Sequence, residues 1–120
     1  MLHRLAIAED EPLSIQLLTE HLSKLDKVDL VLATDNLNEI EWLIRNNRLD
    51  LVLMDINIRG ARPGHVAELL KTKCRFIIIT AYPISHLKGI QPGPNLGFLN
   101  KPVGFVRLRM ELVKVLGVDI

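Results

Sequence analysis

Short runs of apolar residues alternate along the chain with longer segments in which apolar residues recur every three or four positions. The short runs cover about 5–8, 28–33, 51–54, 76–79 and 96–99. The run at 51–54 is apolar at every position, which is typical of a strand that is buried on both faces. The pattern therefore predicts five strands that are separated by helices.

The longer segments predict amphipathic helices. In the first one, Ile15, Leu18 and Leu22 share one face, and Pro12 suits the first turn because no backbone N–H is needed there. A second helix follows the potential capping residues at 34–36, and a third covers about 64–73. The last helix has an apolar face that begins at Phe105 and ends at Leu116.

The segment between residues 83 and 104 interrupts this regular alternation with four prolines and four glycines. Proline removes a backbone hydrogen bond from a helix, and glycine destabilises a helix by about 1 kcal/mol relative to alanine. We therefore expect only a short, irregular helix near 84–89, followed by a loop.

Strands that alternate with helices predict a doubly wound α/β fold, in which helices cover both faces of a parallel sheet. A chain of 120 residues has the size of one domain, so we assign residues 1–120 to a single domain. Trp42 and Phe98 are expected to pack in the core or at its border.

Composition and charge exclude several classes of protein. The chain has 15 basic and 14 acidic residues, and this near balance argues against a nucleic-acid-binding domain. Cys74 is the only cysteine, so the chain has no internal disulfide, and we expect either a small buried side chain or a surface thiol without a role there. No apolar run approaches the roughly 18 residues that span a membrane, and no signal peptide is recognisable. We expect a cytoplasmic protein.

Polar residues stand where the predicted strands end. Glu9 and Asp10 follow the first strand, Asp55 follows the third, Thr80 the fourth, and Lys101 comes just after the fifth. Ligands of parallel sheets bind beyond the carboxyl ends of the strands, so these side chains should converge on one pocket.

Closely spaced carboxylates repel each other unless a cation lies between them, and a site with only oxygen ligands suits Mg²⁺, or Mn²⁺ in its place. A carboxylate such as that of Asp55 can act as a nucleophile and form an acyl phosphate. Phosphoryl transfer depends on charge neutralisation, which a divalent ion, the Lys101 ammonium and the Thr80 hydroxyl would supply. The set of residues therefore favours phosphoryl chemistry.

The sequence resembles the receiver domains of two-component response regulators over essentially its whole length. Four segments carry the resemblance, in the order and spacing of the family: Ala8-Glu9-Asp10-Glu11-Pro12, Leu51-Val52-Leu53-Met54-Asp55, Ile77-Ile78-Ile79-Thr80-Ala81 and Gly97-Phe98-Leu99-Asn100-Lys101-Pro102. The resemblance implies five parallel strands in the order 2-1-3-4-5, flanked by five helices, the fourth of which should here be short or irregular.

The resemblance also implies roles for the acidic residues. Asp55 matches the aspartate that accepts the phosphoryl group, Asp10 matches a metal ligand, and Glu9 matches a second acidic position that often acts through a water. The backbone carbonyl of Asn57 matches a third protein ligand of the Mg²⁺ ion. Asn57 and Tyr82 occupy two variable positions that tune dephosphorylation in the family.

Further roles concern the switch that responds to phosphorylation. Thr80 matches the hydroxyl residue that moves toward the phosphoryl group, and Lys101 matches the lysine that pairs with it. The bond from Lys101 to Pro102 is typically cis in the family. Phe98 matches the aromatic switch position, where tyrosine is commoner, and the segment 83–95 departs from the regular fourth helix.

These residues predict a phosphorylation-dependent signalling switch. We do not expect an enzyme, since the chain would catalyse only its own phosphorylation and dephosphorylation. Asp55 would take a phosphoryl group from a histidine kinase or a phosphotransfer protein, and the face around residues 83–116 would change its affinity for a downstream target protein or an output domain. Two alternatives remain: a non-switching interaction module, and an aspartyl-phosphate phosphatase. No direct contact with nucleic acid or membrane is expected, and the kinase, the target, the oligomeric state and any flanking domain are left open.

Overall fold

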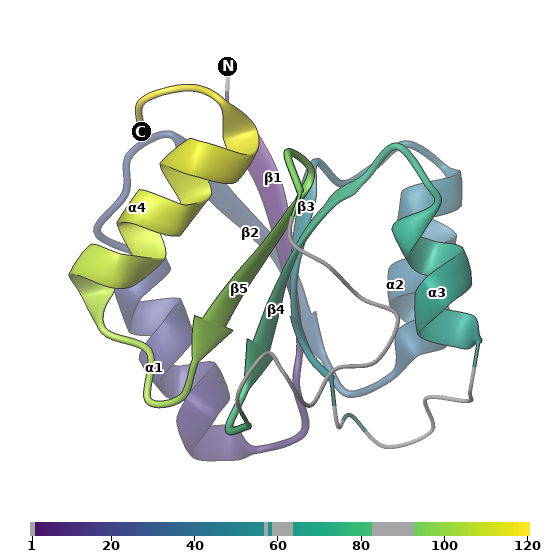
Figure 1. The fold of residues 1–120 in the computed structure, drawn as a ribbon, viewed down its shortest axis with the longest axis horizontal. Helices are drawn as coiled ribbons and strands as arrows, with labels where there is room; N and C mark the ends of the chain where they lie inside the picture. Colours follow the sequence, from purple (N-terminus) through teal and green to yellow (C-terminus); the bar gives the residue numbers. More distant parts are fainter. Residues whose placement is uncertain (1, 57, 59–63, 83–92) are drawn as a thin grey trace.

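The computed structural model describes residues 2–56, 58, 64–82 and 93–120. Within these ranges the chain forms five strands and four helices (Figure 1). The strands are β1 (His3–Ala8), β2 (Val28–Thr34), β3 (Leu51–Asp55), β4 (Arg75–Thr80) and β5 (Leu96–Asn100). The helices are α1 (Pro12–Leu22), α2 (Leu37–Arg45), α3 (His65–Leu70) and α4 (Phe105–Leu116).

The five strands form one parallel sheet in the order β2-β1-β3-β4-β5, which confirms the predicted topology. β1, β3 and β4 lie inside the sheet, and β2 and β5 form its two edges. The pairing of β2 with β1 is in register on both sides of one irregularity, where Leu5 pairs with Leu30 and Ala6 pairs with Leu32.

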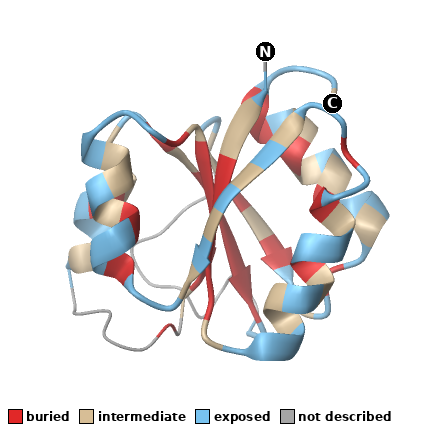
Figure 2. Cartoon of the chain, turned by 180° about the vertical axis from the view of Figure 1, so that it is seen from behind, coloured by how far each residue is buried: buried red, intermediate tan, exposed pale blue. Residues whose placement is uncertain are grey.

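Helices cover both faces of the sheet, so the molecule has three layers with an apolar core on each side of the strands (Figure 1). On one face, Leu18 of α1 and Leu108 of α4 pack against the sheet, and on the other, Ile40 of α2 and Leu69 of α3 do so. Every residue of β3 is buried, as expected for a central strand of a sheet that is covered twice (Figure 2).

The helices match the sequence prediction with two differences. α3 ends at Leu70, short of the predicted 73, because the Thr72 hydroxyl donates to the carbonyl of Leu69 and the chain turns toward β4. The helix that we predict near 84–89 lies outside the described residues.

Trp42 corrects another expectation, since its exposed fraction is 57%. The core face of α2 contains the buried residues Leu37 and Ile40, and a position two residues after Ile40 lies on roughly the opposite side of a helix. Phe98 is half-buried, as predicted, and Cys74 is buried, which is one of its two predicted placements. Of the described helices, none has the length and the apolar composition that crossing a membrane requires.

Candidate functional site

The polar residues that follow the strands meet at the carboxyl edge of the sheet. Asp55 is the last residue of β3 and pairs with Ile79, so it lies beside Thr80 at the end of β4. Thr80 in turn pairs with Asn100 of β5, and Lys101 comes next in the chain. Parallel strands that end in register therefore place the predicted residues at one edge, where a ligand of such a sheet binds.

Three carboxylates are crowded together at this edge. Glu9, Asp10 and Asp55 each offer one oxygen, and these oxygens all lie within 4.8 Å of one another. Glu9 and Asp55 are almost completely buried, with exposed fractions of 1% and 8%. Mutual repulsion in a site with little water means that such a cluster could hold a cation.

Lys101 provides a positive charge to this cluster. Its Nζ donates a hydrogen bond to Oδ2 of Asp55 at 2.9 Å and lies 3.0 Å from Oε2 of Glu9. The same nitrogen is 3.6 Å from Oε2 of Glu11, an exposed side chain to which the sequence assigned no role. Lys101 thus forms ion pairs with three carboxylates, which follow or end two neighbouring strands.

Burial and charge shift the pKa values of two of these groups. Burial raises the pKa of Glu9, and the hydrogen bonds and ion pair that favour its charged form only partly offset this. For Lys101, burial opposes the charge, but the contacts with Asp55 and Glu9 outweigh it and raise the pKa. Oε2 of Glu9 is buried and ion-paired with Lys101 without hydrogen-bond geometry, so it is available to a water or a cation. The donor set, which consists of hard oxygen ligands, fits Mg²⁺.

Thr80 is held by the turn that follows β4. The side chain is fully buried, and its hydroxyl oxygen accepts a hydrogen bond from the backbone N–H of Tyr82 at 3.0 Å. The carbonyl of Thr80 accepts from the N–H of Lys101, and Nδ2 of Asn100 donates to the carbonyl of Tyr82. Asn100 therefore ties the end of β5 to the Thr80 turn, a role that its place before the lysine did not indicate.

Phe98 lies further along β5, on the same side of the sheet as α2 and α3, and the structure does not place it among the carboxylates. Its backbone N–H donates to Oε2 of Glu111 on α4 at 2.8 Å. A Cβ on the neighbouring Gly97 would lie only 2.7 Å from the same oxygen and 2.9 Å from a methyl group of Val115, so a side chain there would displace the Glu111 carboxylate. No periodicity or spacing pointed to Glu111, because its partner is a backbone group.

The remaining predicted residues concern the loops at this edge. The Lys101–Pro102 peptide bond is cis, as the resemblance implies. The next carbonyl, that of Val103, lies 2.9 Å from Nε2 of His21 on α1, which joins the lysine loop to that helix. Asn57, with its predicted backbone ligand, lies outside the described residues, and the Tyr82 side chain is exposed.

No protein-family model and no curated protein matches the chain in sequence. Solved structures match it throughout its length. The response regulator PhyR from Brucella abortus is 26% identical with a TM-score of 0.78, and the match covers 98% of this chain and 49% of that one. The BeF3-activated SdrG from Pseudomonas melonis is 26% identical with a TM-score of 0.75, covering 94% of this chain and 95% of that one.

A third similar structure is the signal receiver domain of a modulated diguanylate cyclase from Desulfovibrio desulfuricans. It is 26% identical with a TM-score of 0.78, and the match covers 98% of this chain and 96% of that domain. The chain spans about half the length of the PhyR structures, but nearly all of SdrG and of this receiver domain. The structural neighbours thus belong to one kind of domain.

Proposed function

We propose that this chain, which has the receiver-domain fold of two-component response regulators, is a signalling switch that is phosphorylated on Asp55. One observation carries the proposal. The Asp55 carboxylate is bonded to Lys101 and lies within a cluster of three carboxylates at the carboxyl edge of a 2-1-3-4-5 sheet.

Glu9, Asp10 and Asp55 are the residues that would hold Mg²⁺, or Mn²⁺ in its place, together with the backbone carbonyl of Asn57. The bound ion would neutralise the negative charge of the phosphoryl oxygens as they approach the carboxylates. The buried Oε2 of Glu9, which makes no hydrogen bond within the described part of the chain, supports this assignment.

The protein residues have separate tasks in the transfer. A carboxylate oxygen of Asp55 attacks the phosphorus atom, the bond from phosphorus to the donor breaks, and an acyl phosphate forms on Asp55. Lys101 Nζ, now 2.9 Å from Asp55, would follow the negative charge onto the phosphoryl group. The Thr80 hydroxyl accepts from Tyr82 and can still donate its own proton to a phosphoryl oxygen.

The phosphoryl donor would be a histidine kinase or a phosphotransfer protein. A cavity of about 280 Å³ lies beside Lys101, between the first turn of α1 and the loop at Pro102 and Val103. Leu13 in that turn is 72% exposed, so an apolar side chain of a donor protein could pack there next to the reacting carboxylate.

The output would be a change in protein contacts at the face around residues 83–116, which includes β5 and α4. The bond from Phe98 to Glu111 gives a path by which a change at β5 would reach α4. We infer that this chain acts on a target protein or output domain and catalyses no reaction other than its own phosphorylation and dephosphorylation.

The experiment is to incubate the purified chain with Mg²⁺ and acetyl phosphate, and to follow the mass and the backbone NMR spectrum. The wild type should gain one phosphoryl group with release of acetate, and Asp55→Asn should gain none. Asp50→Asn is the matched control, because this aspartate precedes β3 at the other end of the strand, and it should be phosphorylated like the wild type.

Three results would contradict the proposal. Wild type that gains no phosphoryl group from acetyl phosphate and shows no Mg²⁺-dependent spectral change is not a receiver in function. Uptake that leaves the spectrum of β5 and α4 unchanged would instead identify a non-switching module. Turnover of p-nitrophenyl phosphate that depends on Asp55 would identify a phosphatase.

A further inference from the structure

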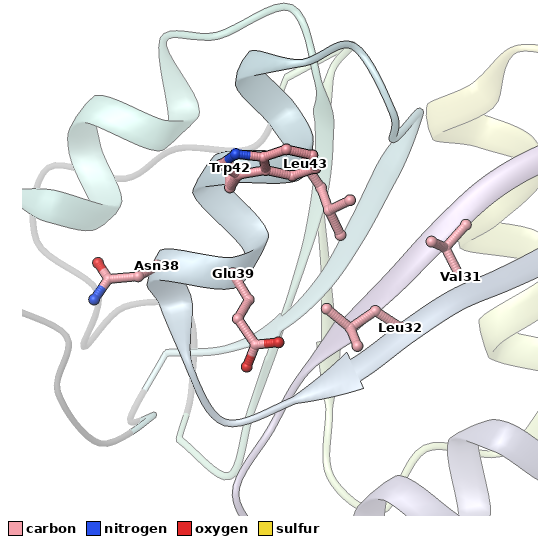
Figure 3. Close-up of a pocket in the computed structure, with 6 residues that line it drawn as sticks. All are labelled: Val31, Leu32, Asn38, Glu39, Trp42 and Leu43. Carbon is pink, nitrogen blue, oxygen red and sulfur yellow. The ribbon is translucent and has the colours of Figure 1, made fainter.

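An apolar groove of about 450 Å³ lies between β2 and α2. Val31 and Leu32 of the strand and Trp42 and Leu43 of the helix line it (Figure 3). Trp42 and Val31 are 57% and 42% exposed, although both are large apolar side chains. Exposed apolar residues that cluster around a hollow mark an interaction site more often than single exposed ones do.

The strand beside the groove is an edge of the sheet. β2 pairs with β1 and with no other strand of the described chain, so one side of its backbone faces away from the sheet. The free side of an edge strand presents N–H and C=O groups that can pair with a further strand. The site therefore combines a backbone that can hydrogen-bond with an apolar hollow for side chains.

The charged residue that lines the groove, Glu39, is acidic, and two further exposed acidic residues lie on β2 or directly after it, against one exposed lysine, Lys27, directly before it. Asp29 precedes Val31 on β2, Asp35 follows the strand, and Glu39 lies on α2, and all three are exposed. Glu39 reaches from the helix to the strand and accepts a hydrogen bond from the Thr34 hydroxyl at 2.9 Å (Figure 3). The acidic side chains give this surface a negative potential that would attract basic groups.

We propose that this surface binds an extended segment of a partner protein in which apolar and basic side chains alternate. The segment adds a sixth strand beside β2, and its apolar side chains enter the groove against Trp42 and Leu43. Its lysines or arginines lie near Asp29, Asp35 and Glu39, or over the exposed face of Trp42. None of the carboxylates of the candidate site, nor Lys101 or Thr80, lines this groove, so the inference does not depend on phosphorylation.

The observations favour such a segment over a second copy of the chain. Two copies that pair through β2 would bring together surfaces on which Asp29, Asp35 and Glu39 outnumber the lysine next to the strand, Lys27. A helix would fill the hollow but would leave the free backbone groups of β2 without partners. An extended basic segment satisfies both the charge and the backbone.

The test uses a synthetic seven-residue peptide of alternating lysine and valine, capped at both ends, and the fluorescence of Trp42, which is the only tryptophan in the chain. We expect binding that shifts the Trp42 emission to the blue and weakens as salt is added. A peptide with glutamate in place of lysine should bind at least about 10-fold more weakly, because it faces like charges. Methylation of the peptide's backbone nitrogens that face β2 should also weaken binding by at least about 10-fold, because those nitrogens could no longer donate hydrogen bonds to the strand.

Val31→Lys should abolish peptide binding, because it places a charge in the groove and repels the lysines. Val106→Lys is the matched control, since Val106 is 68% exposed on α4, and it should bind as the wild type does. Equal binding of the lysine and glutamate peptides, or full binding by folded Val31→Lys, would overturn the proposal. A concentration-dependent dimer of the chain alone that Val31→Lys abolishes would replace the peptide by a second copy.

Discussion

Strand β3 has an aspartate at each end, and the two side chains are in opposite situations. Asp50, just before the strand, accepts from the backbone N–H of Arg4 at 2.7 Å and from its Nε and Nη2 at 3.3 and 3.2 Å. Asp55, the last residue of the strand, shares one lysine with Glu9 and lies in a cluster of three carboxylates. Asp50 pairs with Arg4, whereas the lysine that pairs with Asp55 also pairs with Glu9.

The pKa values at the two ends of β3 distinguish a structural charge from a functional one. Burial would raise the pKa of Asp50, but its hydrogen bonds with Arg4 outweigh this and lower the pKa. At the other end of the strand, burial raises the pKa of Glu9 in spite of Lys101. An aspartate that is paired with an arginine contributes to the stability of the fold. A cluster in which several carboxylates share one lysine instead favours binding of a cation.

The largest effect should come from removing Lys101, the cation that the described residues place in the cluster. Without Mg²⁺, Lys101→Met should lower the free energy of unfolding by about 3 kcal/mol, because Glu9 and Asp55 are left buried with like charge. Urea denaturation measures this. Lys114→Met is the control, since the Lys114 side chain is 57% exposed and its pair with Glu111 is long at 3.5 Å, and it should change stability by less than about 0.5 kcal/mol.

Added Mg²⁺ should restore more of the stability of Lys101→Met than it adds to the wild type. Equal stability of this variant and the wild type in the absence of metal would contradict the idea that the carboxylate cluster lacks positive charge.

A smaller loss is expected at the matched end of β3. Asp50→Ala should lower the free energy of unfolding by about 2 kcal/mol, because the N–H of Arg4 loses its acceptor and the guanidinium loses its ion pair. Asp26→Ala, in the exposed turn before β2, should have almost no effect. If Asp55→Asn destabilises the metal-free protein as much as Asp50→Ala does, the contrast between the two ends of β3 is wrong.

The smallest effect concerns low pH. The pKa of Asp50 is below its ordinary value of 3.8, so the unfolded chain binds more protons at this group than the folded chain does. Its contribution to stability is therefore complete above about pH 4 and is lost as the pH falls through the folded-state pKa. The part of the stability that depends on ionisation of Asp50 should stay below about 1 kcal/mol, because the Asp50–Arg4 pair is about one third exposed.

Denaturation between about pH 4 and pH 2 should show a steeper loss of stability for the wild type than for Asp50→Ala. Parallel curves for the two proteins would mean that Asp50 is not the group that titrates.

Much of the fold and the site could be predicted from the sequence because strand ends are local features. Asp55, Thr80 and Lys101 each terminate an apolar run, and the topology of a parallel sheet then brings such residues to one edge. Asp50 precedes an apolar run, so the same reasoning correctly left it out of the site. The ion pair of Asp50 with Arg4 could not be predicted, because it depends on which strands are neighbours.

Other features depend on packing that spacing does not reveal. The contact of Glu111 with the N–H of Phe98 joins a helix to a backbone group, and nothing in the sequence marks that acceptor. Trp42 shows the reverse error, in which residue type predicted burial although the period of α2 places the side chain away from the core. For the burial of Trp42, its position in the helical period was therefore a better predictor than its residue type.

The bond from Phe98 to Glu111 also has a consequence for self-assembly. On the outer side of β5, the N–H of Phe98 is satisfied by Glu111, and both backbone groups of Leu96 are bonded to Gly93. A strand can therefore be added at the β2 edge but meets occupied hydrogen-bonding groups at the β5 edge. Growth of the sheet from one molecule to the next requires two open edges, so we expect the occupied groups of β5 to oppose fibril formation.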